Sequence, residues 1–243
     1  SQMQTWWNDS YYAWIGFYLG GPNDPKCSVA TSGWISTIES QGWNLVPLYD
    51  GLAAPCATNN SLNMSYDTTT AYSKGEGDAK QAENIVDGLG IQVPIIHEDM
   101  EPFDQYNSSC NAAVAAYASG WTTQLNNDGF LAGLYEYYAN VPALVSGASN
   151  MPIDIYVSNG GCSALKQSNS CTVWNVSGIS NGWFLNDQRL YQYAFNFQDC
   201  YPAGQNCLNV DADATSGLVY GGGGGDSDAN GENEGGGAQA SDP

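Results

Sequence analysis

The sequence predicts an α/β fold built from parallel β/α units, and the number of units favours a (β/α)8 TIM-type barrel. Three observations lead to this prediction. Apolar, strand-like runs alternate with helical patterns and are joined by short turns that contain glycine. Seven or eight candidate strands are present, and charged residues follow several of them. No G-x-G-x-x-G or P-loop pattern supports the alternative, an open doubly wound sheet.

Helices are predicted where apolar residues recur at helical spacing between a capping side chain and a stop signal. A short amphipathic helix near residues 3–11 comes first. The longer predicted helices are 31–42 (Thr31 or Ser32 to Gly42), 78–90 (Asp78 to Gly90) and 107–129 (Asn107 to Gly129).

Strands are predicted from runs of β-branched and aromatic residues bounded by Gly, Pro and Asn. The second half of the chain is less regular than the first, with little helix between its strands. The predicted strands are 14–21, 44–51, 93–101, 130–138, 190–195 and 208–213, with either 152–159 or 171–176 as a further barrel strand.

From Gly221 the chain becomes a glycine-rich, acidic segment without any large apolar residue. Such a segment cannot bury enough surface to offset its chain entropy, so we expect a flexible tail. The predicted organisation is a barrel domain at residues 1–220 and a Gly-rich acidic tail at 221–243.

Charge excludes two classes of partner. The net charge is -20 and only five residues are basic, so a nucleic acid or an anionic membrane surface would be repelled. The chain contains 8 Trp and 16 Tyr, which suit core packing. They also suit sugar binding, because an aromatic ring covers the apolar face of a pyranose. A polysaccharide is therefore the expected partner.

The cysteines indicate an oxidising compartment. There are seven of them and no C-x-x-C pair, which favours disulfides over a zinc or redox site. Spacing predicts the local disulfides Cys162–Cys171 and Cys200–Cys207, and it leaves the pairing of Cys27, Cys56 and Cys110 open.

Five Asn-x-Ser sequons predict a secreted protein that carries N-linked glycans. The predicted glycosylation sites are Asn8, Asn59, Asn63, Asn107 and Asn175.

The strand at 93–101 carries the most chemistry. In a strand with period two, Asp99 and Glu101 point the same way, with His97 behind them, while Glu98 and Met100 face the other side. Two carboxylates in this arrangement suit acid/base catalysis. His97 is the only histidine and is predicted to be an interior residue, so no metal site and no cofactor are expected.

Several sequence blocks occur together and in order between about residues 3 and 218. They include YAWIGFYLGGPN at 12–23, GWNLVPLYDG at 42–51, the D-M-E triplet at 99–101 and RLYQY at 189–193. With these blocks the chain resembles the secreted glycoside-hydrolase-like TIM-barrel family of uncharacterised function, a relative of the glycoside hydrolase family 25 lysozymes.

The resemblance implies roles for three acids at the carboxyl mouth of the barrel. Glu101 would be the general acid, and Asp99 would stabilise an oxocarbenium-like state or orient a substrate N-acetyl group. Asp211 would face the same mouth. The substrate-binding candidates near predicted strand ends are Tyr49, Glu136, Arg189 and Gln192. Arg189 is also a candidate counter-ion for the acidic mouth.

The chain departs from the family pattern at its start. The family begins with a strand ending in Gly-Phe-Asp, and this chain begins after that point. We therefore expect the first barrel strand to be missing, or to be supplied by a separate chain, a cleaved piece or a neighbouring protomer.

The functional prediction is a secreted domain that acts on or binds an extracellular or cell-wall polysaccharide. Whether it is an enzyme is left open; the reaction would be that of a lysozyme-like glycoside hydrolase, either retaining or substrate-assisted. The alternatives are a catalytically silent lectin and a glycosylated structural module of an extracellular matrix or fibre, with strand or tail exchange between protomers.

Overall fold

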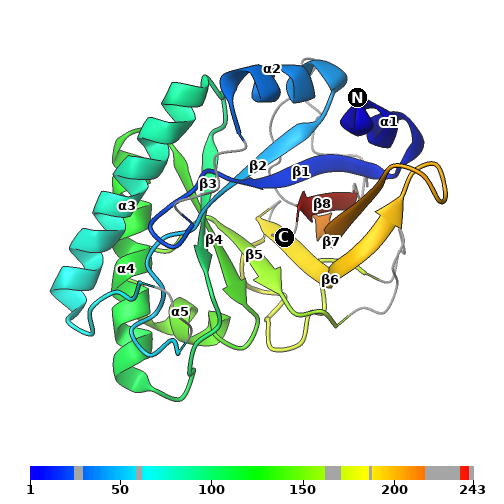
Figure 1. The fold of residues 1–243 in the computed structure, drawn as a ribbon. Helices are drawn as coiled ribbons and strands as arrows, with labels where there is room; N and C mark the ends of the chain where they lie inside the picture. The colour runs from blue at the N-terminus through cyan, green and yellow to red at the C-terminus, as the bar shows by residue number, and fades with distance from the viewer. Residues whose placement is uncertain (25–29, 59–61, 162–170, 186–187, 217–235, 241–243) are drawn as a thin grey trace.

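A computed structural model describes residues 1–24, 30–58, 62–161, 171–185, 188–216 and 236–240 (Figure 1). Eight strands close into one barrel in sequence order. The strands are β1 (Tyr12–Tyr18), β2 (Asn44–Tyr49), β3 (Ile95–Met100), β4 (Leu131–Tyr137), β5 (Asp154–Ser158), β6 (Arg189–Cys200), β7 (Cys207–Thr215) and β8 (Gly236–Ala240). The helices are α1 (Gln2–Asp9), α2 (Ser32–Gln41), α3 (Thr68–Leu89), α4 (Ser108–Asn127) and α5 (Val141–Gly147).

The barrel is mixed, so the prediction of a (β/α)8 barrel is wrong. Strands β1 to β6 pair in parallel, but β7 is antiparallel to both β6 and β8. An antiparallel hairpin needs no helical crossover. Within the described ranges no helix follows β5, and in Figure 1 α3, α4 and α5 lie together on one side of the barrel, with α2 above it and α1 on the other side.

The first-strand position is occupied by the chain itself. Strand β8, from the glycine-rich tail, runs parallel to β1 and antiparallel to β7. The expectation that the chain lacks this strand is therefore wrong. Exchange of strands between protomers stays a prediction.

Capping side chains fix where the helices begin. Thr31 and Asn107 cap α2 and α4 as predicted, each accepting a hydrogen bond from a backbone N–H in the first turn. Helix α3 begins at Thr68, after an Asp67 cap, and not at Asp78. Asp78 is buried within it.

The sequence did not reveal the first turns of α3 because they contain glycine, which lowers helix propensity. Packing requires small residues here. A Cβ on Gly75 would overlap the backbone of α4 at Tyr117, and one on Gly120 would overlap α3 at Tyr72. The two glycines let α3 and α4 lie close together, side by side in Figure 1.

Helix α5 was not predicted, and the strand-like residues 171–176 form turns and bends rather than a strand. The barrel strand at this point is β5, within the other candidate range of 152–159. Residues 171–176 are instead held outside the barrel by Arg189, as described below.

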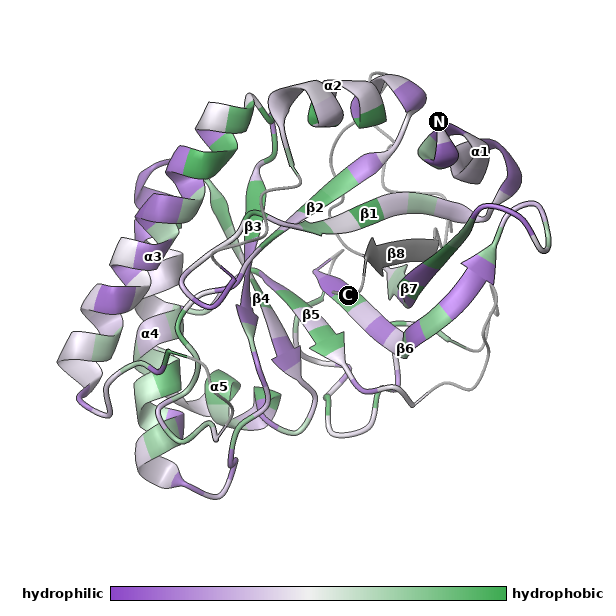
Figure 2. Cartoon of the chain, viewed as in Figure 1, coloured by the Kyte–Doolittle hydropathy of each residue, from purple (hydrophilic) through white to green (hydrophobic). Residues whose placement is uncertain are grey.

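Apolar side chains form two layers. The outer faces of the strands pack on the helices, and a smaller cluster fills the barrel interior: Trp14, Val46, Leu48, Tyr156 and Leu190. In Figure 2 the ends of β3 and β4 take the hydrophilic colour, which marks where the polar residues of the barrel begin. None of the helices in the described part of the chain is long and apolar enough to cross a membrane.

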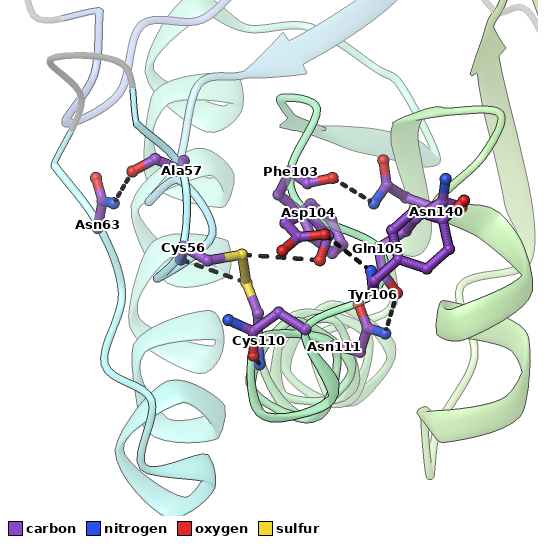
Figure 3. Close-up of a disulfide and its surroundings, with 11 residues drawn as sticks. Cys56, Ala57, Asn63, Phe103, Asp104, Gln105, Tyr106, Cys110, Asn111 and Asn140 are labelled. Carbon is purple, nitrogen blue, oxygen red and sulfur yellow. Dashed lines mark hydrogen bonds between the residues drawn. A yellow bond between two sulfur atoms is a disulfide. The ribbon is translucent and has the colours of Figure 1, made fainter.

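Disulfides tie loops together. The predicted pair Cys200–Cys207 is confirmed, and Cys56 pairs with Cys110 across 54 residues of sequence (Figure 3). Cys171 is disulfide-bonded. Its predicted partner Cys162, like Cys27, lies outside the described residues.

The described sequons lie on loops or helix ends. Asn8, Asn63 and Asn175 are exposed, and Asn107 is the half-buried cap of α4. Asn59 lies outside the described residues. N-glycosylation stays a prediction.

Candidate functional site

The alternation of β3 directs its polar residues to opposite faces. His97 and Asp99 point into the barrel, where His97 meets the Tyr156 ring edge-on and Asp99 meets Tyr18 of β1. Met100 belongs to the outer core. The acidic strand therefore presents Asp99 and, at its end, Glu101 to the mouth of the barrel, the end where β1 to β5 finish.

Asp99 lies just below the mouth and is 5% exposed. The Tyr18 hydroxyl donates a 2.8 Å hydrogen bond to Oδ2, while Oδ1 has no partner among the described residues. Burial and then the charge of Glu101 raise the pKa of Asp99 well above its usual range, and the Tyr18 hydrogen bond opposes this rise. Asp99 therefore holds a proton more readily than a carboxyl in water does.

Glu101 follows the last residue of β3 and is exposed. Nearby protein atoms still remove part of its solvation, which raises its pKa. Its loop is anchored on two sides. Asn140 donates to the Phe103 carbonyl at 3.1 Å, and the Cys56–Cys110 disulfide joins the start of α4 to the loop after β2 (Figure 3).

Asp211 of β7 is oriented by a chain of hydrogen bonds. The Tyr135 hydroxyl donates to Gln192 Oε1 at 2.6 Å, so the Gln192 amide nitrogen is directed to Asp211 Oδ2, at 3.2 Å. The backbone N–H of Asn196 donates to the other oxygen, Oδ1. Burial raises the pKa of Asp211, and the Asn196 N–H opposes that rise.

Asp213 lies deeper in the barrel and is fully buried. Burial raises the pKa of Asp213 well above its usual range, and the neighbouring Tyr156 hydroxyl opposes that rise. The adjacent pair His97 and Asp154, 3.3 Å apart between Nε2 and Oδ1, is also fully buried. This confirms His97 as an interior residue.

Two of the proposed substrate-binding residues lie on the outer face of the barrel. Tyr49 packs by the Trp121 ring, with its hydroxyl 3.4 Å from Gln81 Oε1. Glu136 is fully buried on the face that Leu134 occupies, and its Oε1 accepts from the Tyr137 N–H. Burial raises the pKa of Glu136 well above its usual range. Of the four candidates, only Gln192 joins the acids at the mouth.

Arg189 is not a counter-ion for these acids. Its guanidinium stacks on the Trp174 ring, 4.4 Å from the centroid. It donates hydrogen bonds to four backbone carbonyls of the segment between β5 and β6, those of Val173, Ser180, Trp183 and Phe184. Carbonyl groups of a loop, rather than carboxylates, accept the hydrogen bonds of this guanidinium.

The tyrosines at the site were not singled out from the sequence. Tyr18 and Tyr135 are half-buried, and Tyr156 is fully buried beneath them. Period-two alternation from Trp14 along β1 places Tyr18 inside the barrel, so the signal was present. Within the described ranges, no three His, Cys, Asp or Glu side chains lie where they could hold a metal ion.

The mouth thus combines carboxyl groups in different environments. Asp99 accepts one hydrogen bond and keeps one oxygen unpaired, whereas both oxygens of Asp211 accept N–H donors. Hydrogen bonds to the charged form favour ionisation, and burial disfavours it. Asp211 is therefore the better candidate for a charged group, and Asp99 and Glu101 for groups that hold a proton.

Comparison with solved structures finds the same fold at low sequence identity. A crystal structure of an uncharacterized B. stearothermophilus protein matches with a TM-score of 0.50 and 17% identity, over 82% of this chain and 85% of that one. The Tat-secreted protein Rv2525c of Mycobacterium tuberculosis, solved in complex with L-tartrate, matches with a TM-score of 0.50 and 12% identity, over 84% of this chain and 83% of that one. No curated protein matches.

A family comparison covers almost all of the barrel. The Rv2525c-like, glycoside hydrolase-like domain matches residues 4–215, from α1 to the last residue of β7. The chain therefore belongs to the Rv2525c-like family of glycoside hydrolase-like domains.

Proposed function

We propose that the protein acts on an extracellular polysaccharide, with Asp99 and Glu101 at the barrel mouth as the reacting carboxyl pair. The observation that carries this proposal is Asp99 itself. It is a buried carboxyl with a raised pKa, one unpaired oxygen and a tyrosine partner, next to the exposed Glu101. Perturbed carboxyl groups at the carboxyl end of barrel strands are typical of catalytic sites.

Each acid has a role that suits its surroundings. Glu101 is exposed and can reach a glycosidic oxygen, so it is the general acid. Asp99, held by Tyr18, orients a substrate N-acetyl group or, when it ionises beside the sugar, stabilises the positive charge that develops there. Asp211, held by two N–H donors, supplies a fixed negative charge opposite them.

Three features support an extracellular location. The described cysteines form disulfides, which persist in oxidising compartments. Exposed sequons are available for glycosylation at Asn8, Asn63 and Asn175. The mycobacterial relative is a Tat-secreted protein. A cell-wall polysaccharide and a lysozyme-like reaction are the finer parts of this proposal.

The test is the release of reducing ends from a panel of polysaccharides that includes chitin and peptidoglycan. Glu101→Gln should abolish turnover, and Asp99→Asn should reduce it by about a hundredfold or more, as loss of an acid/base group does. The matched control is Asp104→Asn, an exposed acid of the same loop whose Oδ1 accepts from the Tyr106 N–H and can still do so as an amide. Full activity of Glu101→Gln would refute the assigned role.

Absence of turnover on the whole panel, with binding that Asp99→Asn weakens, would instead identify a lectin.

The structural-module alternative is favoured by one observation, the closure of the barrel by a strand from the tail. If β8 is exchanged between copies, sedimentation should show a dimer at high protein concentration that is lost when residues 217–243 are removed. A monomer at every concentration would refute exchange.

A further inference from the structure

We propose that the glycan recognised at this mouth carries protonated amines, as glucosamine residues do, rather than only acetylated or acidic sugars. This inference rests on the proposed function, because it names the substrate class of the same site. It comes from the balance of charge around the mouth and from the unpaired oxygen of Asp99.

Basic side chains do not complement the acids. Four carboxyl groups without a basic partner line the mouth and the lumen below it: Asp99, Glu101, Asp211 and Asp213. A fifth, Asp154, pairs with His97. Of the basic residues in the described part of the chain, Arg189 is used by loop carbonyls, and Lys80 binds Glu83 at 2.8 Å and Asp128 at 2.5 Å on the helical flank. The last, Lys74, lies on α3.

Lys26 and Lys166 lie outside the described residues. The carboxyl groups repel one another: in addition to burial, the charge of Glu101 raises the pKa of Asp99, and that of Asp211 raises the pKa of Asp213. A ligand with carboxylate or sulfate groups would add to this repulsion, which is costly where solvent is partly excluded. A cationic ligand would relieve it.

The unpaired oxygen of Asp99 gives this argument a specific point of contact. Buried polar atoms are nearly always hydrogen-bonded, so an orphan oxygen at a site calls for a donor that arrives with a ligand. Asp99 is only 5% exposed. Its Oδ2 accepts a hydrogen bond from Tyr18, and its Oδ1 has no hydrogen-bond partner among the described residues. An ammonium group is a donor that also favours ionisation of the carboxyl.

Tyrosine rings beside these acids suit the same ligand. Tyr18 and Tyr135 are half-buried at the level of Asp99, and Tyr137 follows at the end of β4. A ring face covers the apolar face of a sugar and also attracts a nearby cation. Acids for the amine and rings for the sugar therefore occur together.

The experiment compares three oligosaccharides of equal length, binding to the full chain at low ionic strength by calorimetry. They are a β-linked glucosamine oligomer at a pH where its amines are protonated, its fully N-acetylated counterpart, and an oligogalacturonate. We expect the glucosamine oligomer to bind at least about tenfold more tightly than the acetylated one and to lose affinity as salt is added. The oligogalacturonate should not bind.

The net charge of -20 could attract any polycation, so the control removes equal charge elsewhere. Asp9 and Asp87 are exposed at the ends of α1 and α3, which precede β1 and β3 and so lie at the opposite end of the barrel. The double variant Asp99→Asn with Asp211→Asn should lose at least about tenfold in affinity for glucosamine. Asp9→Asn with Asp87→Asn should lose much less.

Each outcome decides the proposal. Equal losses in the two double variants would show non-specific attraction and overturn it. Equal or tighter binding of the acetylated oligomer, still weakened by Asp99→Asn, would also overturn it but would leave the proposed glycan function standing. Failure of every oligosaccharide to bind, with no turnover, would overturn both. Release of protons to the buffer on binding, seen in buffers of different ionisation enthalpy, would support ionisation of Asp99 beside the bound ammonium.

Discussion

Replacement of both cysteines of the Cys56–Cys110 disulfide by alanine should lower the free energy of unfolding by about 4 kcal/mol. The disulfide closes a loop with a sequence separation of 54 residues, and the chain-entropy relation for a loop of that size gives about 4 kcal/mol at room temperature. Alanine is the choice because Cys110 is fully buried in the outer core, where a serine hydroxyl would need a partner.

The second disulfide provides the matched comparison. Cys200 and Cys207 are separated by 7 residues, for which the same relation gives about 2.5 kcal/mol. Urea unfolding of the two double-alanine variants, followed by tryptophan fluorescence, should therefore show a larger loss for Cys56 and Cys110 by about 1.5 kcal/mol. Equal losses, or a larger loss at the short loop, would refute the reasoning from loop closure.

Three further changes test the interior and the site. Gly133→Ala would place a Cβ in the ring of His97, so it should lower the free energy of unfolding by about 1–3 kcal/mol. Glu98→Gln should remove one part of the pH dependence of stability. Burial, then the charges of Asp99 and its neighbours, raise the pKa of Glu98, so the folded state keeps a proton that the unfolded state releases above about pH 4.3. The stability of the parent protein should fall with rising pH by up to about 1.4 kcal/mol per pH unit through this group, as measured by urea unfolding across pH. Tyr18→Phe removes a hydrogen bond that lowers the pKa of Asp99, so that pKa should rise further. Carbon NMR of the Asp99 carboxyl would measure it.

Controls for these changes lie in the same chain. Gly77→Ala in α3 meets no atom within 4 Å and should stabilise rather than destabilise. Asp87→Asn, which removes an exposed carboxyl from α3, is the matched control for Glu98→Gln. Tyr106→Phe is the same chemical change as Tyr18→Phe at a residue that is 88% exposed, and it should not move the titration of Asp99. A pKa of Asp99 unchanged in Tyr18→Phe would contradict the hydrogen bond.

Local signals predicted the first half of the fold because each element there is fixed by its own residues. The caps Thr31 and Asn107 and the apolar runs of β1 to β4 all lie where the pattern placed them. The predictions failed where contacts between residues far apart in the sequence determine the structure. Gly75 lowers helix propensity locally, yet α3 extends through it because α4 packs against it. Arg189 was a candidate counter-ion for the acids, but its guanidinium donates its hydrogen bonds to loop carbonyls.

Strand direction explains the part of the site that the sequence could not give. Asp211 and Asp213 share one face of β7, and the sequence alone predicted similar positions for them. Because β7 is antiparallel to β6, it runs away from the mouth, and Thr215 pairs with Leu190 while Asp213 pairs with Gln192. Asp213 therefore lies deeper than Asp211, fully buried against Tyr156.

The same reversal separates the two carboxyl groups chemically. Asp211 stays half-buried at the mouth, where Gln192 and the Asn196 N–H can reach it because β6 continues past this level. A parallel β7 would have reversed the order, with Asp213 nearer the mouth and Asp211 beneath it. Period-two alternation predicts which face a residue occupies, but depth along the barrel depends on strand direction, and that is set by pairing with β6 and β8. The site thus owes its charged acid to the antiparallel hairpin that distinguishes this barrel from a (β/α)8 fold.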